Sequence, residues 1–100
     1  LIGETELKGV ELNSNGEISE LDIDGMFVAI GLVPQNDVFK SIVELDERGY
    51  IVSGENCLTS TDGIFVAGDC RTKRIRQVIT AAGDGAISAL AACDYADKIK

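Results

Sequence analysis

Histidine and tryptophan are absent from this sequence of 100 residues, aromatic residues account for only 5%, and proline occurs once. Histidine is the commonest general base and a frequent metal ligand. Its absence confines any chemistry to carboxylates, thiols, backbone groups or a bound cofactor. The remaining composition, with 45% hydrophobic and 26% charged residues, is that of an ordinary globular chain and argues against disorder, collagen or a coiled coil.

Basic residues are scarce as well, because 9 lysines and arginines face 17 aspartates and glutamates, for a net charge of −8. An acidic surface repels nucleic-acid phosphates and anionic lipids, so we expect neither nucleic acid nor a membrane as a partner. A spanning helix needs about 20 apolar residues, and runs such as residues 26–30 are much shorter. No signal-peptide pattern is visible, and because Leu1 is not Met we expect this chain to be part of a longer one.

The three cysteines, Cys57, Cys70 and Cys93, form neither a Cys-x-x-Cys pair nor a metal-ligand spacing. An odd number without a framework is typical of reduced thiols, so we expect a cytoplasmic location and no metal site. We interpret Cys93 as a small packing residue, because it falls on the apolar spacing of a helix.

The first third of the chain is typical of strands. Residues 7–13 and 17–23 alternate apolar and polar side chains around the turn residues 14–16, which predicts a hairpin with one solvent-facing side. Residues 25–31 form a continuous apolar run, typical of a strand buried on both faces. Pro34 cannot lie within a central strand, so we place a domain boundary after residue 31.

Shorter elements follow, and the strongest pattern comes last. Residues 37–42 predict a helical turn capped by Asn36 or Asp37, and residues 50–52 and 64–67 predict short strands. A helix is predicted over residues 77–96, with one apolar face that carries Ile79, Ala82, Ala86, Leu90 and Cys93.

Two features near this helix could carry chemistry. Gly68 has no Cβ to block a ligand, and Asp69 follows it at the position where open α/β sheets bind ligands. The free N–H groups at the helix start, near Arg76 and Gln77, could hold an anion or an electron-rich carbonyl. From these residues alone a turn cap explains Asp69 better, and a surface salt bridge explains Arg76 better than an anionic ligand does.

Taken together, these motifs resemble a known family. TSTDGIFVAGDC (residues 59–70), followed by RQVITAAGDGAISA (residues 76–89), is similar to the C-terminal end of bacterial low-molecular-weight thioredoxin reductases. These belong to the pyridine nucleotide-disulfide oxidoreductase superfamily. Residues 24–36 resemble that family's last strand of the NADPH domain and its return into the FAD domain, and residues 45–52 also fit. The resemblance covers nearly the whole chain.

The resemblance implies roles for five residues. Asp69 matches the aspartate that binds the ribityl chain of FAD, and Gly68 is the close-approach residue beside it. Arg76, Gln77 and Val78 match the Arg-Gln-Ala stretch at the helix start that faces the flavin ring. Val78 replaces the usual Ala, a mild departure because backbone N–H contacts survive it. A helix N-terminus also suits the negative charge of a reduced flavin.

The resemblance further implies a partial three-layer α/β fold of the FAD/NAD(P)-binding type. An N-terminal β-hairpin and strand precede a strand–helix tail of the FAD domain, with an α+β appearance when the piece is isolated. Residues 1–31 are expected to be the C-terminal strands of the NADPH-binding domain, and residues 32–100 the C-terminal part of the FAD-binding domain. Uncovered strand edges favour pairing with another chain, so we expect a homodimer or a swapped arrangement.

The family passes electrons from NADPH to FAD, then to an active-site disulfide and then to thioredoxin. The redox Cys-x-x-Cys is absent from this segment, so we expect no catalytic residue here, and an isolated fragment that is inactive and binds FAD weakly or not at all. Two related flavoenzymes are alternatives, the flavoprotein subunit of alkyl hydroperoxide reductase and a thioredoxin-reductase-like ferredoxin–NADP reductase. A non-catalytic dimerisation module is a third.

Overall fold

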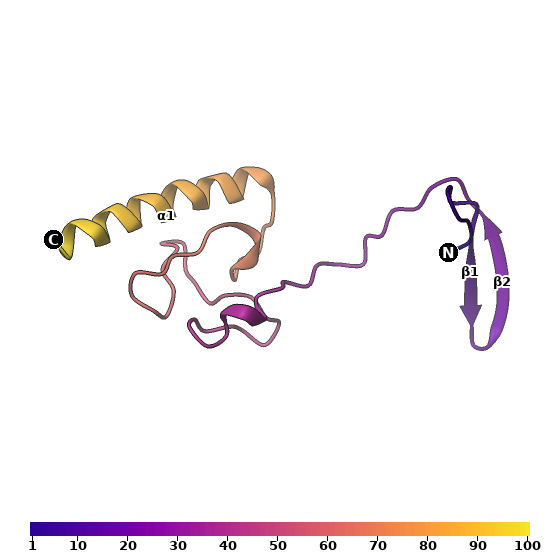
Figure 1. Cartoon of the computed structure of the whole chain (residues 1–100), viewed down its shortest axis with the longest axis horizontal. Coiled ribbons are helices and arrows are strands. Elements are labelled where there is room, and N and C mark those ends of the chain that lie inside the picture. The colour runs from indigo at the N-terminus through magenta and orange to yellow at the C-terminus, as the bar shows by residue number, and fades with distance from the viewer. The chain divides into compact units, whose positions relative to one another are not determined.

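The computed structural model describes all 100 residues and divides them into two compact units, Leu1–Gly31 and Leu32–Lys100. The first unit holds the hairpin and the second holds the long helix (Figure 1). The elements, in chain order, are strands β1 (Gly9–Ser14) and β2 (Glu17–Asp22), the 3-10 turns η1 (Asp37–Phe39) and η2 (Gly68–Cys70), and helix α1 (Val78–Lys98).

The predicted hairpin is present, and its turn explains its register, but both of its faces are exposed, so the single solvent-facing side expected for it is wrong. β1 and β2 are antiparallel, and Ser14 pairs with Glu17, so the connection has two residues, Asn15 and Gly16. Their φ angles are 55° and 93°, the combination that a type I′ turn requires and that Asn-Gly adopts most readily. The Asn13 Oδ1 accepts a hydrogen bond from the Gly16 N–H at 3.0 Å and closes the turn further.

The strand predicted over residues 25–31 is absent, which corrects that expectation. No residue of this run belongs to a strand or bridge, and the side chain of Phe27 is fully exposed while that of Ile30 is 93% exposed. A strand buried on both faces needs neighbouring strands and covering layers. The hairpin is the only sheet in this chain, and residues 25–31 do not pair with it.

The core of the second unit is small and made of loops. Val43, Ile51 and Val66 are buried together, and Leu45, Ile64 and Cys70 pack against them. The predicted strands at 50–52 and 64–67 occur only as single bridges, because each segment pairs with its neighbour at one position. Ile51, for example, bridges Leu45 on one side and Arg71 on the other. These bridges still hold the segment ending at Gly68 beside the core.

Helix α1 begins one residue later than predicted and ends two residues beyond, but it packs through a different face. The apolar face named above is exposed, including Leu90 at 69% and Cys93, so the core roles expected for that face are wrong. The helix instead buries Asp84, and Tyr95 on the same side makes an edge-to-face contact with Phe65 at 6.1 Å between ring centroids. Neither α1 nor any other helix combines the length and apolar character needed to cross a bilayer.

Candidate functional site

Gly68 opens a tight turn directly after the last buried segment. Ala67 is extended, and Gly68 then takes a φ of 82°, a left-handed conformation that glycine adopts without strain. The Arg71 N–H closes the turn on the Gly68 carbonyl at 3.4 Å. The turn leaves Asp69 exposed, while Gly68 itself is buried against α1.

The start of α1 faces solvent. Gln77 is the N-cap residue, and its N–H donates to the Thr80 Oγ1 at 3.1 Å, so Thr80 satisfies one donor ahead of the first turn. Val78, the first helical residue, is 88% exposed. The first N–H groups of a helix have no carbonyl partner within it, and here the side chains beside them leave access from solvent.

Arg76 joins the turn to the helix start. Its Nε donates to the Asp69 carbonyl at 3.2 Å and its Nη2 to the Arg71 carbonyl at 3.3 Å, while its guanidinium lies over the Tyr50 ring at 3.9 Å. It takes part in no ion pair, so the surface salt bridge expected from the residues alone is wrong. Carbonyl oxygens and an aromatic face hold this cation where a helix N-terminus disfavours it.

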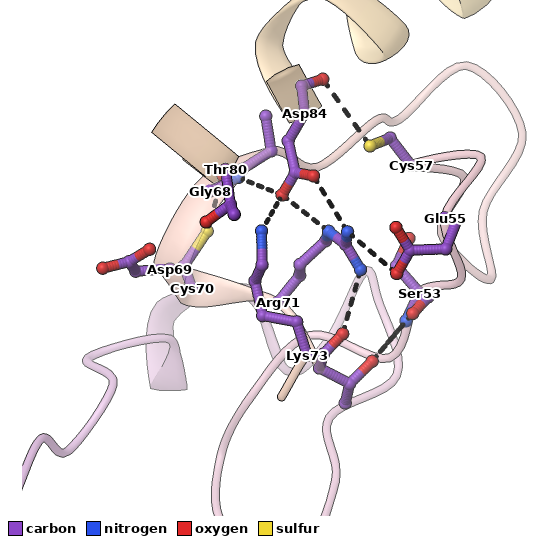
Figure 2. A network of polar contacts seen from close by, with 12 residues as sticks. Ser53, Glu55, Cys57, Gly68, Asp69, Cys70, Arg71, Lys73, Thr80 and Asp84 are labelled. Atoms are coloured by element: carbon purple, nitrogen blue, oxygen red, sulfur yellow. Dashed lines mark hydrogen bonds and ion pairs between the residues drawn. The ribbon is translucent and has the colours of Figure 1, made fainter. Parts of the chain in front are cut away.

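A buried ionic network lies behind the turn (Figure 2). The side chains of Asp84 and Arg71 are 6% and 1% exposed, and the Arg71 Nε and Nη2 donate to the two carboxylate oxygens at 2.8 and 2.9 Å. The Lys73 Nζ approaches the Oδ2 of Asp84 to 2.7 Å. The Gly68 N–H donates to the same oxygen at 3.0 Å.

This geometry keeps both partners charged. Hydrogen bonds from Arg71 hold the pKa of Asp84 well below its usual range; they outweigh burial, which raises it, and Lys73 and the Gly68 N–H lower it further. The hydrogen bond to Asp84 correspondingly raises the pKa of Arg71, although burial opposes the shift. A buried carboxylate is tolerated only when it is paired in this way.

Asn36 ties a second segment to the turn. Its Nδ2 donates to the carbonyls of Gly49 and Cys70 at 2.9 and 2.8 Å. Asn36 is the N-cap residue of η1, one of the two candidates expected there, but its side chain makes no capping hydrogen bond. The side chain is instead a bridge between three loops, because a buried amide has two donors to place and these carbonyls lie within reach.

The structure therefore brings together the residues that the sequence singled out. Gly68 and Asp69 on the turn, and Arg76, Gln77 and Val78 at the helix start, form one surface region, because Arg76 bonds to the backbone of Asp69 and η2 packs against α1. Sequence reasoning missed Arg71 and Lys73, considered Asn36 only as a helix cap, and gave Asp84 no role. One signal was available for Asp84, which is the only charged residue between Arg76 and Asp94.

These groups can hold a polyhydroxylated, partly anionic molecule. The side chain of Asp69 points away from the ionic network (Figure 2), so its carboxylate is free to accept hydroxyl hydrogen bonds. The helix start offers N–H donors and a partial positive charge a few residues away. At Gly68 an added Cβ would make only ordinary contact with Ala81, so the glycine is needed for its backbone conformation. The carboxylate acceptor thus fits the sugar-alcohol chain of a flavin, and the N–H donors fit its ring carbonyl.

Comparison with known proteins assigns the chain to a class. Residues 1–85 match the family described as pyridine nucleotide-disulphide oxidoreductase. The match covers most of the chain, which therefore belongs to this family of oxidoreductases.

Within the family the chain is similar to thioredoxin reductases. That of Peptoclostridium acidaminophilum is 49% identical over 73 residues, which cover 73% of this chain and 23% of the relative. That of Treponema pallidum is 45% identical over 100 residues, covering 98% of this chain and 32% of the relative. The crystal structure of Lactococcus lactis thioredoxin reductase in its FR conformation superposes with a TM-score of 0.75 at 33% identity, covering 91% of this chain and 31% of that one.

Similarity extends beyond thioredoxin reductases. One alkyl hydroperoxide reductase subunit of Staphylococcus aureus is 43% identical over 97 residues, which cover 95% of this chain and 19% of the relative. The chain therefore spans a third or less of each of these proteins. Its structure is a partial α/β fold, matching the corresponding part of the Lactococcus lactis enzyme.

Proposed function

We propose that this segment forms one wall of the FAD site in an NADPH-dependent flavoenzyme that reduces the disulfide of thioredoxin. The observation that carries the proposal is the junction of Asp69 and the start of α1 through the hydrogen bond from Arg76 to the Asp69 carbonyl. Membership of the pyridine nucleotide-disulphide oxidoreductase family and similarity to proteins named thioredoxin reductase support it.

Each residue has a defined part in this proposal. Asp69 accepts hydrogen bonds from the ribityl hydroxyls, and the N–H groups beginning at Val78 face the carbonyl edge of the flavin ring. Arg76 and Gln77 hold the helix start in place beside the turn. When bound, the flavin supplies hydride and electron transfer between a nicotinamide and a disulfide. The helix N-terminus stabilises the negative charge of its reduced form.

The division after Gly31 belongs to the same proposal. Residues 1–31 would be the last strands of an NADPH-binding domain, and residues 32–100 the end of the FAD-binding domain. The two compact units, Leu1–Gly31 and Leu32–Lys100, support this assignment. In such a protein the apolar residues 25–31 would pair with strands of the NADPH-binding domain.

Replacing Asp69 in the longer flavoprotein tests the cofactor role. Asp69→Asn should raise the flavin dissociation constant by about tenfold, the loss expected for charge-assisted hydrogen bonds to hydroxyls. Asp62→Asn is the matched control, because Asp62 is also an exposed loop aspartate and makes no side-chain hydrogen bond. Flavin fluorescence released on dilution gives both constants, and equal values for the two variants would contradict the role of Asp69.

A second experiment concerns the 100-residue chain alone. It holds one wall of the proposed site and no Cys-x-x-Cys, so we expect it to be inactive and to bind FAD weakly or not at all. An absorbance titration with FAD followed by desalting measures this directly. A visible flavin band that stays with the protein through desalting would contradict the expectation.

The main alternative to a thioredoxin reductase is a related flavoenzyme, and the two differ in their electron acceptor. Similarity to the alkyl hydroperoxide reductase of Staphylococcus aureus supports a flavoprotein that reduces a disulfide on a different partner. The test is the rate of NADPH oxidation by the longer protein with thioredoxin or with a peroxidase partner as the acceptor. A ferredoxin–NADP reductase would need no Cys-x-x-Cys, and a dimerisation module would bind no flavin at all.

Two further properties belong to the proposal. A homodimer is supported by the exposed apolar face of α1, where Ile79 is 77% and Leu90 69% exposed. A cytoplasmic location is supported by three cysteines that are all free thiols. Sedimentation of the longer protein at several concentrations measures the first, and a monomer at high concentration would contradict it.

A further inference from the structure

The Oδ2 atom of Asp84 is shared by three donors from three different residues. It accepts the Gly68 N–H at 3.0 Å, the Arg71 Nε at 2.8 Å and the Lys73 Nζ at 2.7 Å. The Oδ1 atom accepts the Arg71 Nη2 at 2.9 Å. One carboxylate on helix α1 therefore reaches across to the backbone of the turn and is neutralised there by two cations.

The contact with Gly68 is the informative one. Gly68 belongs to no β-bridge, and its N–H donates to Asp84. The residue next in the chain is Asp69, whose carboxylate points to the opposite side (Figure 2). The hydrogen bond to Gly68 thus sets the direction in which the turn presents Asp69.

Arg71 makes the arrangement rigid from a second side. Besides its two bonds to Asp84, its Nη1 donates to the Thr72 carbonyl at 3.0 Å and its Nη2 contacts Glu55 at 3.4 Å. A planar guanidinium bound through both edges has little freedom to rotate. Because Arg71 directly follows the turn, the ionic pair holds the turn at its first residue, Gly68, and at Arg71 after its last.

We propose that Asp84 is a positioning residue for flavin binding, which fixes the Gly68–Cys70 turn against α1 so that Asp69 and the helix start meet one cofactor. This inference rests on the proposed function and names a further residue of the same site. In this proposal Asp84 acts through the backbone of Gly68.

Replacing Asp84 in the longer flavoprotein tests the inference. Asp84→Asn keeps the size but turns one acceptor into a donor, which faces the donors of Gly68, Arg71 or Lys73. We expect the flavin dissociation constant to rise by about tenfold or more, the loss expected for a buried hydrogen bond to a charged group. Asp84→Glu keeps the charge and should bind flavin more tightly than Asp84→Asn does.

The matched control is Asp94→Asn, on the same helix. Asp94 is exposed and has no hydrogen-bond or ion-pair partner, so its replacement should leave the flavin dissociation constant unchanged. Each variant is measured well below its unfolding temperature, with circular dichroism as the check that it is folded. A folded Asp84→Asn variant with the affinity of the wild-type protein would overturn the inference.

If the Asp84→Asn variant does not fold, a double variant provides the same test. Arg71→Gln with Asp84→Asn removes the more deeply buried of the two cations together with the carboxylate, so Lys73 alone is left without its partner. It should fold better than the single variant and still bind flavin weakly. Wild-type affinity in the folded double variant would overturn the inference.

One measurement needs no variant. Because Asp84 accepts the Gly68 N–H at 3.0 Å, the amide of Gly68 should be protected from hydrogen exchange in the wild-type protein. Exchange as fast as in an unstructured peptide would overturn the inference, whatever the variants do. The two proposals fail differently: a wild-type protein that binds no flavin refutes both, whereas flavin binding that is indifferent to Asp84 refutes only this one.

Discussion

The guanidinium of Arg76 lies 3.9 Å from the centroid of the Tyr50 ring, although the two residues are 26 positions apart in the chain. Tyr50 is buried, and its hydroxyl donates to the Leu32 carbonyl at 3.4 Å, so the ring has a defined orientation. The stack holds a cation beside the N-terminus of α1, where it would otherwise be repelled, and joins the core of the second unit to the proposed flavin surface.

A double-mutant cycle measures this contact. With Tyr50→Leu and Arg76→Met we expect a coupling free energy of about 0.5 to 1 kcal/mol, the range of a partly exposed cation–π pair. The control cycle pairs Tyr50→Leu with Arg74→Met, because Arg74 is exposed and contacts no aromatic ring. Denaturant unfolding gives each value, and equal coupling in the two cycles would argue against a specific stack.

Asn36→Ala should lower the free energy of unfolding by about 1 to 3 kcal/mol, the cost of buried polar groups left without partners. The substitution removes both donors from the carbonyls of Gly49 and Cys70, and Asn36 is only 5% exposed. Gln35→Ala, at the exposed neighbouring position, should have little effect on the same urea unfolding curve. A similar loss for both variants would show that the Asn36 amide is not a structural bridge.

Protonation of Asp84 at acid pH should lower the free energy of unfolding. Its pKa in the folded protein lies below that of an unfolded aspartate, so its contribution is present above about pH 4. That contribution is lost as the pH falls from there toward the folded pKa, because the unfolded chain then binds more protons. The free energy of unfolding, measured from neutral pH downward, should decline less steeply in Asp84→Asn than in the wild-type protein. Parallel curves would mean that another carboxylate dominates.

The three thiols should react with iodoacetamide in the order of their exposure. Cys93 is exposed and Cys70 is half-buried, whereas Cys57 has no accessible surface. Burial, and after it the charge of Asp84, raises the pKa of the Cys57 thiol, so this group stays protonated at neutral pH and reacts slowly. Peptide mass spectrometry of the native 100-residue chain follows each site. Labelling of Cys57 ahead of Cys93 would contradict the packing described here.

The turn, the helix and the family motifs could be predicted without the structure. Asn15-Gly16 predicts a two-residue turn because both positions tolerate a positive φ, and the hairpin follows from that turn and the alternating residues beside it. The sequence places helix α1 within two residues at either end, since small and apolar residues there repeat at helical spacing. The motifs around Gly68 and Arg76 indicate the family, which comparison with known proteins confirms.

Which apolar residues are buried could not be predicted from the sequence. The residues 25–31 have the composition of a buried strand, yet they remain exposed and unpaired because a strand needs partners that this chain does not supply. On α1, the hydrophobic pattern predicted burial of the face of Leu90, which stays exposed, while the one buried residue of the helix is the charged Asp84 on the opposite side. The hydrophobic pattern indicates which residues favour burial. Only the tertiary structure decides which of them have a surface to pack against.

The sequence by itself determined the turn and the helix, because each depends on residues within a few positions of one another, and it determined the family, because its motifs are recognised without knowing their partners in space. Only the tertiary structure decided the partners of Asp84 and Asn36, since these side chains are satisfied by groups 11 or more positions away. A buried polar group must find its hydrogen bonds wherever the fold brings them. In this chain those long-range bonds hold the turn that presents Asp69.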